Sequence, residues 1–335
     1  VSNEISKYMG KMQNKKTNHL EVHFHSPSFK CIPKSFPKLT NSLEILLMER
    51  RFPAVLGDIE KENYILNKKI VEKNSGIQIL FSKHEAKPGL LVSAGPSLDD
   101  ILPYLKQIDE KFILACVDTA FPILSRERIT LDYVFSLDPQ EDSFQYFQDH
   151  LENTAKLIFT PSANTKVIHY YKGEKFVVFK KTSTLFDKNE SDMNTKGTTQ
   201  SGGSVSCLAL DVLIQFGCNP IFLTGQDLSF PCNRIYSSFS NNNKQMMDKL
   251  DSVSMLKENH KAASRKEKTV TVENIAGDKV ATNQAMYSYL RAIEEIAAVN
   301  PETKIYNLCS HGAQINNVIP LGSANELMKF LTCYS

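Results

Sequence analysis

Short hydrophobic runs alternate with helical patterns between residues 84 and 240. The runs are the length of single strands and are apolar almost throughout, with little alternation of polar positions. A strand has this pattern when both of its faces are buried, as in a parallel sheet covered by helices on each side. We expect strands at 89–93, 112–117, 132–136, 156–160, 175–179 and 219–224. The pattern therefore predicts an α/β fold with a doubly wound, mainly parallel, Rossmann-like sheet.

The chain before this block has a weaker pattern. Apolar residues between 40 and 74 recur at helical spacing, and Pro53 separates two predicted helices. We expect residues 1–83 to form a small N-terminal domain that is helical or α/β.

The chain after the block is predicted to be a helical extension over residues 241–335. The stretch 241–268 is polar and predicted helical, 277–300 contains an amphipathic helix, and 303–308 has the pattern of one more strand. We expect this extension to pack on the sheet formed by the domain over residues 84–240.

Composition narrows the class of protein. The chain has 335 residues, 41% of them hydrophobic, and 39 basic residues against 37 acidic ones for a net charge of +2. These values are typical of a globular protein and exclude disordered, collagen-like and coiled-coil classes. A net charge this small gives no field to attract nucleic acid, and no apolar run is long enough to span a membrane. We expect no nucleic-acid partner.

The cysteines and the first residues of the chain bear on the cellular compartment of the protein and on its processing. Seven cysteines without a Cys-x-x-Cys pair indicate reduced thiols in a cytoplasmic protein and no metal site. The first residues are polar and rich in lysine, so no signal peptide is expected. A first residue of valine indicates a piece of a longer protein.

Polar residues are concentrated where the predicted strands end. Ligands of open parallel sheets bind beyond the carboxyl ends of the strands, so this is where we expect the site. The residues concerned are 93–97, Asp118, Asp138, 201–204 and 225–227.

The turn over residues 94–97 leads from a strand into a helix. Gly95 allows close approach of backbone, and Ser97 is a natural N-cap for the helix that follows. Such a helix start can hold phosphate, but it can also be a plain capped helix. Asp99 and Asp100 add negative charge, which disfavours an anion there. The turn is neither Gly-x-Gly-x-x-Gly nor a P-loop, which disfavours a nicotinamide or Walker-type ATP site.

Two further strand-end segments carry chemistry. Small residues and hydroxyls over 198–206 precede a helix and suit a ribose or phosphate, or simply tight packing of that helix on the sheet. Asp227 directly follows a strand, where a carboxylate could meet a hydroxyl, a base edge or a metal ion, or cap its own loop.

Taken in order, these motifs resemble a known family. The motility accessory factors, which are bacterial flagellin glycosyltransferases with a sialyltransferase-like central domain, have similar motifs. The resemblance covers about residues 84–320 and is carried by 92–98, 117–120, 136–140, 202–206, 217–228, 277–282 and 305–315.

The resemblance implies a reaction. A nonulosonic acid of the pseudaminic, legionaminic or sialic type would pass from its CMP-activated form to Ser or Thr hydroxyls of flagellin. The enzyme would be inverting and independent of metal, with no cofactor apart from the CMP-sugar donor. The implied nucleotide-binding residues are Gly95, Pro96, Ser97, Asp118, Asp138, Ser201, Gly202, Gly203, Ser204, Gly225, Gln226 and Tyr236.

The same resemblance implies a histidine as general base. His260 and His311 are the available candidates, because an imidazole has a pKa near neutral and can take the proton of an acceptor hydroxyl. Asp227 is the alternative base or a carboxylate that orients the acceptor. Lys261 and Arg265 could neutralise phosphate charge.

Two alternatives stay open. A 6-hydroxymethylpterin pyrophosphokinase would use ATP and Mg²⁺, with Asp118, Asp138 and Asp227 as possible metal ligands. A module that binds flagellin without catalysis is the other. The sequence leaves the oligomeric state open.

Overall fold

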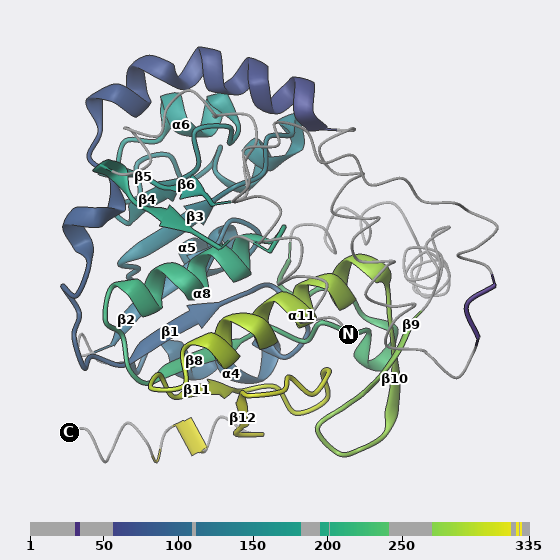
Figure 1. Cartoon of the computed structure of the whole chain (residues 1–335). Helices are drawn as coiled ribbons and strands as arrows, with labels where there is room; N and C mark the ends of the chain where they lie inside the picture. Colours follow the sequence, from purple (N-terminus) through teal and green to yellow (C-terminus); the bar gives the residue numbers. More distant parts are fainter. Residues whose placement is uncertain are drawn as a thin grey trace, which may run out of the picture. The chain divides into compact units, whose positions relative to one another are not determined.

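The computed structural model (Figure 1) describes residues 31–33, 56–108, 112–181, 195–200, 202–240, 270–322, 326–327 and 329. The chain divides into two compact units, Val1–Val55 and Leu56–Ser335. Apart from residues 31–33, every described residue belongs to the second unit. Of the segment 1–83 that was predicted to form an N-terminal domain, residues 1–30 and 34–55 lie outside the described residues, as does the whole polar stretch 241–268.

A single eight-stranded sheet forms the centre of the second unit, and every neighbouring pair of its strands is parallel. Its order is β12-β11-β8-β1-β2-β3-β4-β5. The strands are β1 (Gly89–Val92), β2 (Ile113–Val117), β3 (Tyr133–Ser136), β4 (Lys156–Phe159), β5 (Lys175–Val177), β8 (Ile221–Thr224), β11 (Ile305–Asn307) and β12 (Ile319–Pro320). The predicted Rossmann-like α/β fold is confirmed.

Helices cover both faces of this sheet. They are α4 (Leu98–Leu105), α5 (Phe121–Arg126), α6 (Thr165–Tyr170), α8 (Val205–Gln215) and α11 (Gln284–Val299). Helix α8 crosses β1, β2 and β3, and α11 lies beside it (Figure 1). Because connections between parallel strands are right-handed, the β1-α4-β2-α5-β3 path places α4 and α5 on the opposite face. Strands β1, β2, β3 and β8 are buried along their whole length, which explains their continuous apolar sequences.

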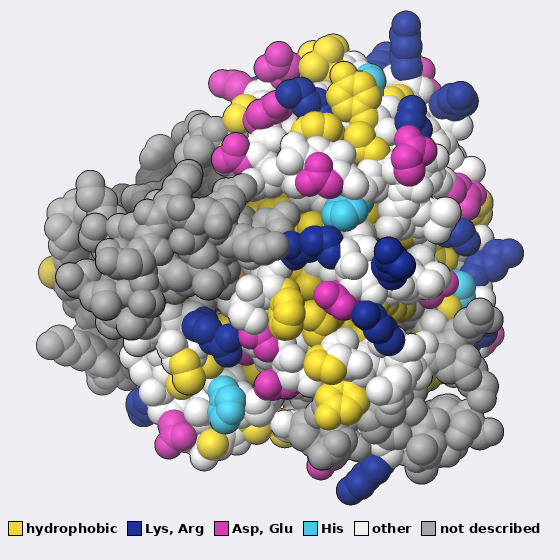
Figure 2. All heavy atoms as spheres, turned by 180° about the vertical axis from the view of Figure 1, so that it is seen from behind, with side chains coloured by type: hydrophobic (Ala, Val, Ile, Leu, Met, Phe, Trp, Pro, Cys, Tyr) yellow, Lys and Arg dark blue, Asp and Glu magenta, His cyan; other side chains and the backbone are white. Residues whose placement is uncertain are grey.

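Short elements connect the layers. The 3₁₀ turns are η1 (Ile77–Leu80), η2 (Glu141–Tyr146) and η4 (Pro231–Asn233), and β6 (Phe179–Lys180) pairs with β7 (Thr198–Thr199). Among the described residues, no helix combines the length and the apolar character that crossing a membrane requires. On the face turned away from the view of Figure 1, basic and acidic side chains are interspersed (Figure 2).

The C-terminal region packs its helix α11 against α8 and adds strands to the sheet. The predicted amphipathic helix is α11 and the predicted strand is β11, so both are confirmed. The sequence did not predict the antiparallel hairpin of β9 (Val270–Glu273) and β10 (Lys279–Thr282). Because β11 pairs directly with β8, this region contributes strands to the sheet in addition to the predicted helix.

A helix over residues 56–73 holds the loops that follow β3 and β4. The side-chain amide of Asn63 donates to the carbonyl oxygens of Pro139 at 2.8 Å and Ser162 at 3.2 Å. The amide of Asn67 donates at 3.0 Å to the carbonyl oxygens of the residues on either side of Ser162. Both asparagines are buried, so these contacts replace hydrogen bonds to water that folding removes.

Candidate functional site

The order of the sheet reverses between β1 and β8. From β1 the chain proceeds through β2, β3, β4 and β5 on one side, whereas β8 and β11 lie on the other side. In open α/β sheets, ligands bind beyond the carboxyl ends of the strands at such a switch point. The turn after β1, residues 93–97, and the turn after β8, residues 225–227, both lie there.

Hydrogen bonds join these two turns, and we call residues 93–97 and 225–227 together the strand-end clasp. The Ser93 hydroxyl donates to Oε1 of Gln226 at 2.7 Å. The Gly95 N–H donates to the Gly225 carbonyl at 2.9 Å. The Ser97 N–H and Oγ both donate to Oδ2 of Asp227, at 3.1 and 2.9 Å. The predicted residues from the two turns are therefore in direct contact.

The approach of the two turns is so close that it requires glycine. A Cβ on Gly95 would lie 2.3 Å from Oδ2 of Asp227 and 2.4 Å from the Gly225 carbonyl oxygen. A Cβ on Gly225 would lie 1.9 Å from the Ser93 carbonyl oxygen, and the φ angle of Gly225 is +66°. Both distances are far inside van der Waals contact, and a positive φ is costly for other residues.

Ser97 has a different role from the one predicted. It occupies the position before α4, but its backbone is helical, with φ −68° and ψ −11°, and its side chain makes no capping hydrogen bond. The N-cap prediction is wrong because the Ser97 hydroxyl is engaged by Asp227, which is 130 residues away in the sequence. Ser97 therefore ties the start of α4 to the end of β8.

Asp227 is an internal acceptor of the clasp. Its side chain is 3% exposed. Burial raises the pKa of this carboxyl group, and hydrogen bonds from Ser97 and Cys309 oppose that rise. Oδ2 accepts the two bonds from Ser97, and Oδ1 accepts one from the Cys309 thiol at 3.2 Å. Since both carboxylate oxygens have donors, the geometry suits holding the turns together better than abstracting a proton from a substrate.

The loop after β11 forms a third part of the site. The Gly312 N–H donates to Sγ of Cys309 at 3.0 Å, and the Ala313 N–H donates to the carbonyl of Asp227 at 2.8 Å. Burial raises the pKa of the Cys309 thiol, which therefore stays protonated and can donate. His311 lies in this loop and is exposed. Sequence reasoning missed Cys309, and its place directly after a predicted strand was the available signal.

Asp118 and Asp138 lie at the ends of β2 and β3, on the other side of β1 from β8. Burial raises the pKa of Asp118 to about 7, and the nearby Asp138 carboxylate adds to that rise. The Thr119 N–H, which donates to Asp118 at 2.7 Å, opposes it. Burial also raises the pKa of Asp138, which accepts the Gln140 N–H at 2.9 Å. The two predicted carboxylates are thus brought near one another.

Asp99 does not stand as an unbalanced charge beside the clasp. Arg234 donates to its Oδ2 at 2.8 Å, and the Ser237 hydroxyl donates to its Oδ1 at 2.6 Å. Tyr236 lies between these two residues in the sequence and is half-buried. The segment after η4 therefore folds against the start of α4 and compensates the charge of Asp99, one of the two carboxylates that disfavoured an anion there.

The start of α8 favours the packing interpretation of its glycines. Gly202 has a φ of +49°, and a Cβ there would lie 2.4 Å from Ala292 of α11. Gly203 has a φ of +77°. The Ser204 hydroxyl accepts the Ser206 N–H at 3.2 Å, so Ser204 is the N-cap of α8. The predicted site residues Ser201 and His260 lie outside the described residues.

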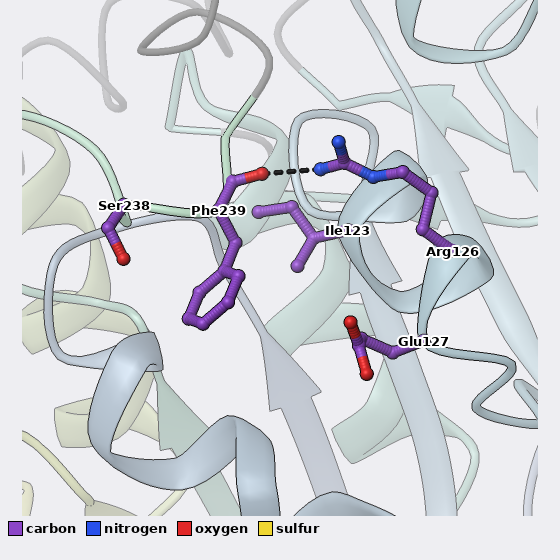
Figure 3. Close-up of a pocket in the computed structure, with 5 residues that line it drawn as sticks. All are labelled: Ile123, Arg126, Glu127, Ser238 and Phe239. Atoms are coloured by element: carbon purple, nitrogen blue, oxygen red, sulfur yellow. Dashed lines mark hydrogen bonds between the residues drawn. The ribbon is translucent and has the colours of Figure 1, made fainter.

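A separate hollow of about 240 Å³ lies at the end of α5 (Figure 3). Its lining residues are Ile123, Arg126, Glu127, Ser238 and Phe239, and the Arg126 guanidinium donates to the carbonyl of Phe239. None of the predicted site residues lines it. We therefore place the candidate site at the clasp and not in this hollow.

Comparisons with known proteins agree with this fold. A family model described as 6-hydroxymethylpterin diphosphokinase MptE-like matches residues 62–233. A solved structure, the MAf glycosyltransferase from Magnetospirillum magneticum AMB-1, is similar with a TM-score of 0.55 and 17% identity. The match covers 75% of this chain and 37% of the MAf glycosyltransferase chain, so it spans little more than a third of the length of that chain. No curated protein matches. The resemblance of fold to a motility accessory factor, expected from the sequence, is confirmed.

Proposed function

Because this chain belongs to the family described as 6-hydroxymethylpterin diphosphokinase MptE-like, we propose that it is a transferase that binds a nucleotide-activated substrate at the strand-end clasp. The clasp itself carries the proposal. Two turns meet at the switch point of a parallel sheet, and glycines bring their backbones together without side chains between them. Open α/β sheets bind nucleotides at this place.

Within this class we favour glycosyl transfer. The donor is a CMP-activated nonulosonic acid of the pseudaminic, legionaminic or sialic type, and the acceptor is a Ser or Thr hydroxyl of flagellin. The likeness of fold to a MAf glycosyltransferase supports this choice. The loop after β11 supports it too. This loop packs on Asp227, so the site includes residues beyond 233, where the match to the MptE-like family model ends.

The proposed reaction is an inverting displacement. The acceptor oxygen forms a bond to the anomeric carbon while the bond from that carbon to the CMP phosphate oxygen breaks, and CMP leaves with the electron pair. A base takes the hydroxyl proton. His311 is the base we favour, because it is exposed and its neighbour Gly312 packs against Asp227. Asp227 orients the clasp, and His260 is the alternative base.

A second candidate is favoured by the pair Asp118 and Asp138. A diphosphokinase would transfer diphosphate from ATP to a hydroxymethylpterin with Mg²⁺ present. Magnesium is commonly held by one or two carboxylates together with the substrate phosphates, and these two residues fit that need. Within the described ranges, no group of three or more His, Cys, Asp or Glu side chains could hold a metal ion by itself. The substrate phosphates would have to complete the coordination.

A thermal-shift comparison of CMP, CDP, ATP with and without Mg²⁺, and NAD separates these functions. A ligand at about 100 times its Kd adds about 2.7 kcal/mol to the stability of the folded state, which raises the Tm by about two degrees or more. Stabilisation by CMP and CDP without metal supports glycosyl transfer. Stabilisation by ATP only with Mg²⁺ supports the diphosphokinase, and no shift with any nucleotide supports a module that only binds flagellin.

A transfer assay then tests the base. His311→Gln should lower the rate of sugar transfer to flagellin while CMP still binds, because the base acts on the acceptor and not on the nucleotide. His169→Gln, at an exposed position of α6, is the matched control and should retain full activity. Unchanged transfer by the His311 variant would leave His260 as the base.

A further inference from the structure

Asn307, the last residue of β11, is buried without a partner for its side chain. It is 2% exposed, yet among the described residues neither its Nδ2 nor its Oδ1 has a hydrogen-bond partner. Five other buried side chains leave one such atom each: Asn67, Ser136, Thr160, Ser162 and Thr224. Burying an amide without hydrogen-bond partners costs free energy, and a ligand that forms those hydrogen bonds would recover it. Asn307 is therefore a candidate ligand-binding group.

The position of Asn307 is at the candidate site. Asn307 pairs with Leu223 of β8, and Leu223 lies two residues before the clasp residues 225–227. The chain continues from Asn307 to Cys309, whose thiol donates to Asp227. Asn307 is therefore next to the switch point and on the strand whose loop closes the clasp.

The strand register shows which face of the sheet Asn307 occupies. Neighbouring Tyr306 lies on the other face and stacks on Phe222, with ring centroids 5.2 Å apart. Asn307 shares its face with Leu223 and, across the pairing of β8, β1, β2 and β3, with Tyr133. The Tyr133 ring packs on Phe216 at the end of α8. Asn307 is therefore on the face that α8 and α11 cover.

We propose that the side-chain amide of Asn307 binds the base of the nucleotide substrate. This inference rests on the proposed function and specifies which part of the nucleotide Asn307 contacts. A carboxamide presents one donor and one acceptor side by side, which matches a base edge with an acceptor beside a donor, such as N3 and the 4-amino group of cytosine. Since neither amide atom is open to solvent, neighbouring side chains shift when the base enters.

The test is Asn307→Leu in the full chain, which keeps the side-chain size and removes both hydrogen-bonding groups. The stability without ligand should be unchanged or higher, because an unpartnered amide is lost. The affinity for CMP, measured by calorimetric titration, should fall about 10- to 100-fold, because the base loses two hydrogen bonds. If Asn307 had only a structural role, the variant would instead be less stable without ligand and would bind CMP with unchanged affinity.

Asn67→Leu is the matched control. Asn67 is also a buried asparagine, but its Nδ2 donates to two backbone carbonyls in the loop after β4. Its replacement should lower the stability without ligand and leave the Kd for CMP unchanged. Ribose 5-phosphate, which has no base, should bind the wild-type chain and the Asn307 variant equally.

Each other outcome overturns the assignment in a recognisable way. Equal CMP affinity of the wild type and the Asn307→Leu chain would show that Asn307 does not contact the base. Destabilisation as large as that of Asn67→Leu would show that the amide has protein partners. A loss of ribose 5-phosphate binding would move the contact to the sugar. No CMP binding by the wild type would refute the proposed function together with this inference.

Discussion

The buried carboxyl group of Asp118 should make the protein less stable as the pH rises. Asp118 is 4% exposed at the end of β2, and burial raises its pKa from the ordinary value of 3.8 to about 7. The folded state therefore binds this proton more tightly than the unfolded chain does. The stabilisation is complete below about pH 4 and is lost as the pH rises through about 7, because above that pH the folded state must hold a buried charge.

The size of the effect follows from the pKa difference. A difference of about 3 pKa units corresponds to about 4 kcal/mol, at 1.36 kcal/mol for each unit. Asp118→Asn removes the charge, and the amide oxygen can still accept the Thr119 N–H. The variant should therefore be more stable than the wild type by about 4 kcal/mol at about pH 8 and nearly equal to it at about pH 4.

Urea denaturation at several pH values between about 4 and about 8 measures this difference. Asp100→Asn, at an exposed position of α4, is the control and should follow the wild-type curve. Parallel curves for the wild type and Asp118→Asn across this range would refute the reasoning. They would mean that the carboxylate is hydrated or paired in the folded protein.

Three further predictions concern the clasp and its support. Gly95→Ala places a Cβ 2.3 Å from Oδ2 of Asp227 and should lower the free energy of unfolding by about 1–3 kcal/mol and weaken CMP binding, both measurable by denaturation with and without CMP. Cys309→Ala leaves Oδ1 of Asp227 without its donor and should cost about 1–3 kcal/mol, whereas Cys309→Ser keeps a donor and should cost less; equal losses would argue against the hydrogen bond. Asn63→Ala frees the carbonyl of Pro139 and should speed amide exchange in the loop that carries Asp138; unchanged exchange would show that the loop holds itself.

The fold could be predicted because its signals are local. Strands β1, β2, β3 and β8 are buried on both faces and therefore have continuous apolar sequences. The hairpin of β9 and β10 has mostly exposed or half-buried residues, so its sequence lacks that signal. Both residues of strand β12 are exposed, so the hydrophobic pattern does not predict this strand either.

The site could be predicted only in part. The position of Asp118, Asp138 and Asp227 at one edge of the sheet could be predicted, because parallel strands end at the same edge, which makes strand-end carboxylates neighbours. The partner of each group depends on contacts between distant parts of the chain. Ser97 has the local pattern of an N-cap, but a carboxylate 130 residues away takes its hydroxyl. Cys309 directly follows a predicted strand, but nothing in its local sequence shows that its thiol donates to Asp227, which is 82 residues away.

The pairing of β11 with β8 has a consequence for biosynthesis. A ribosome makes the chain from the N-terminus, so β8 emerges more than 80 residues before its outer neighbour. During that interval the outer edge of β8 (Ile221–Thr224) has no partner, and a mostly apolar strand with an open edge can recruit other chains. Nascent chains stalled between these strands should therefore depend on chaperones, and a gene shortened before residue 305 should yield aggregates instead of a smaller folded protein.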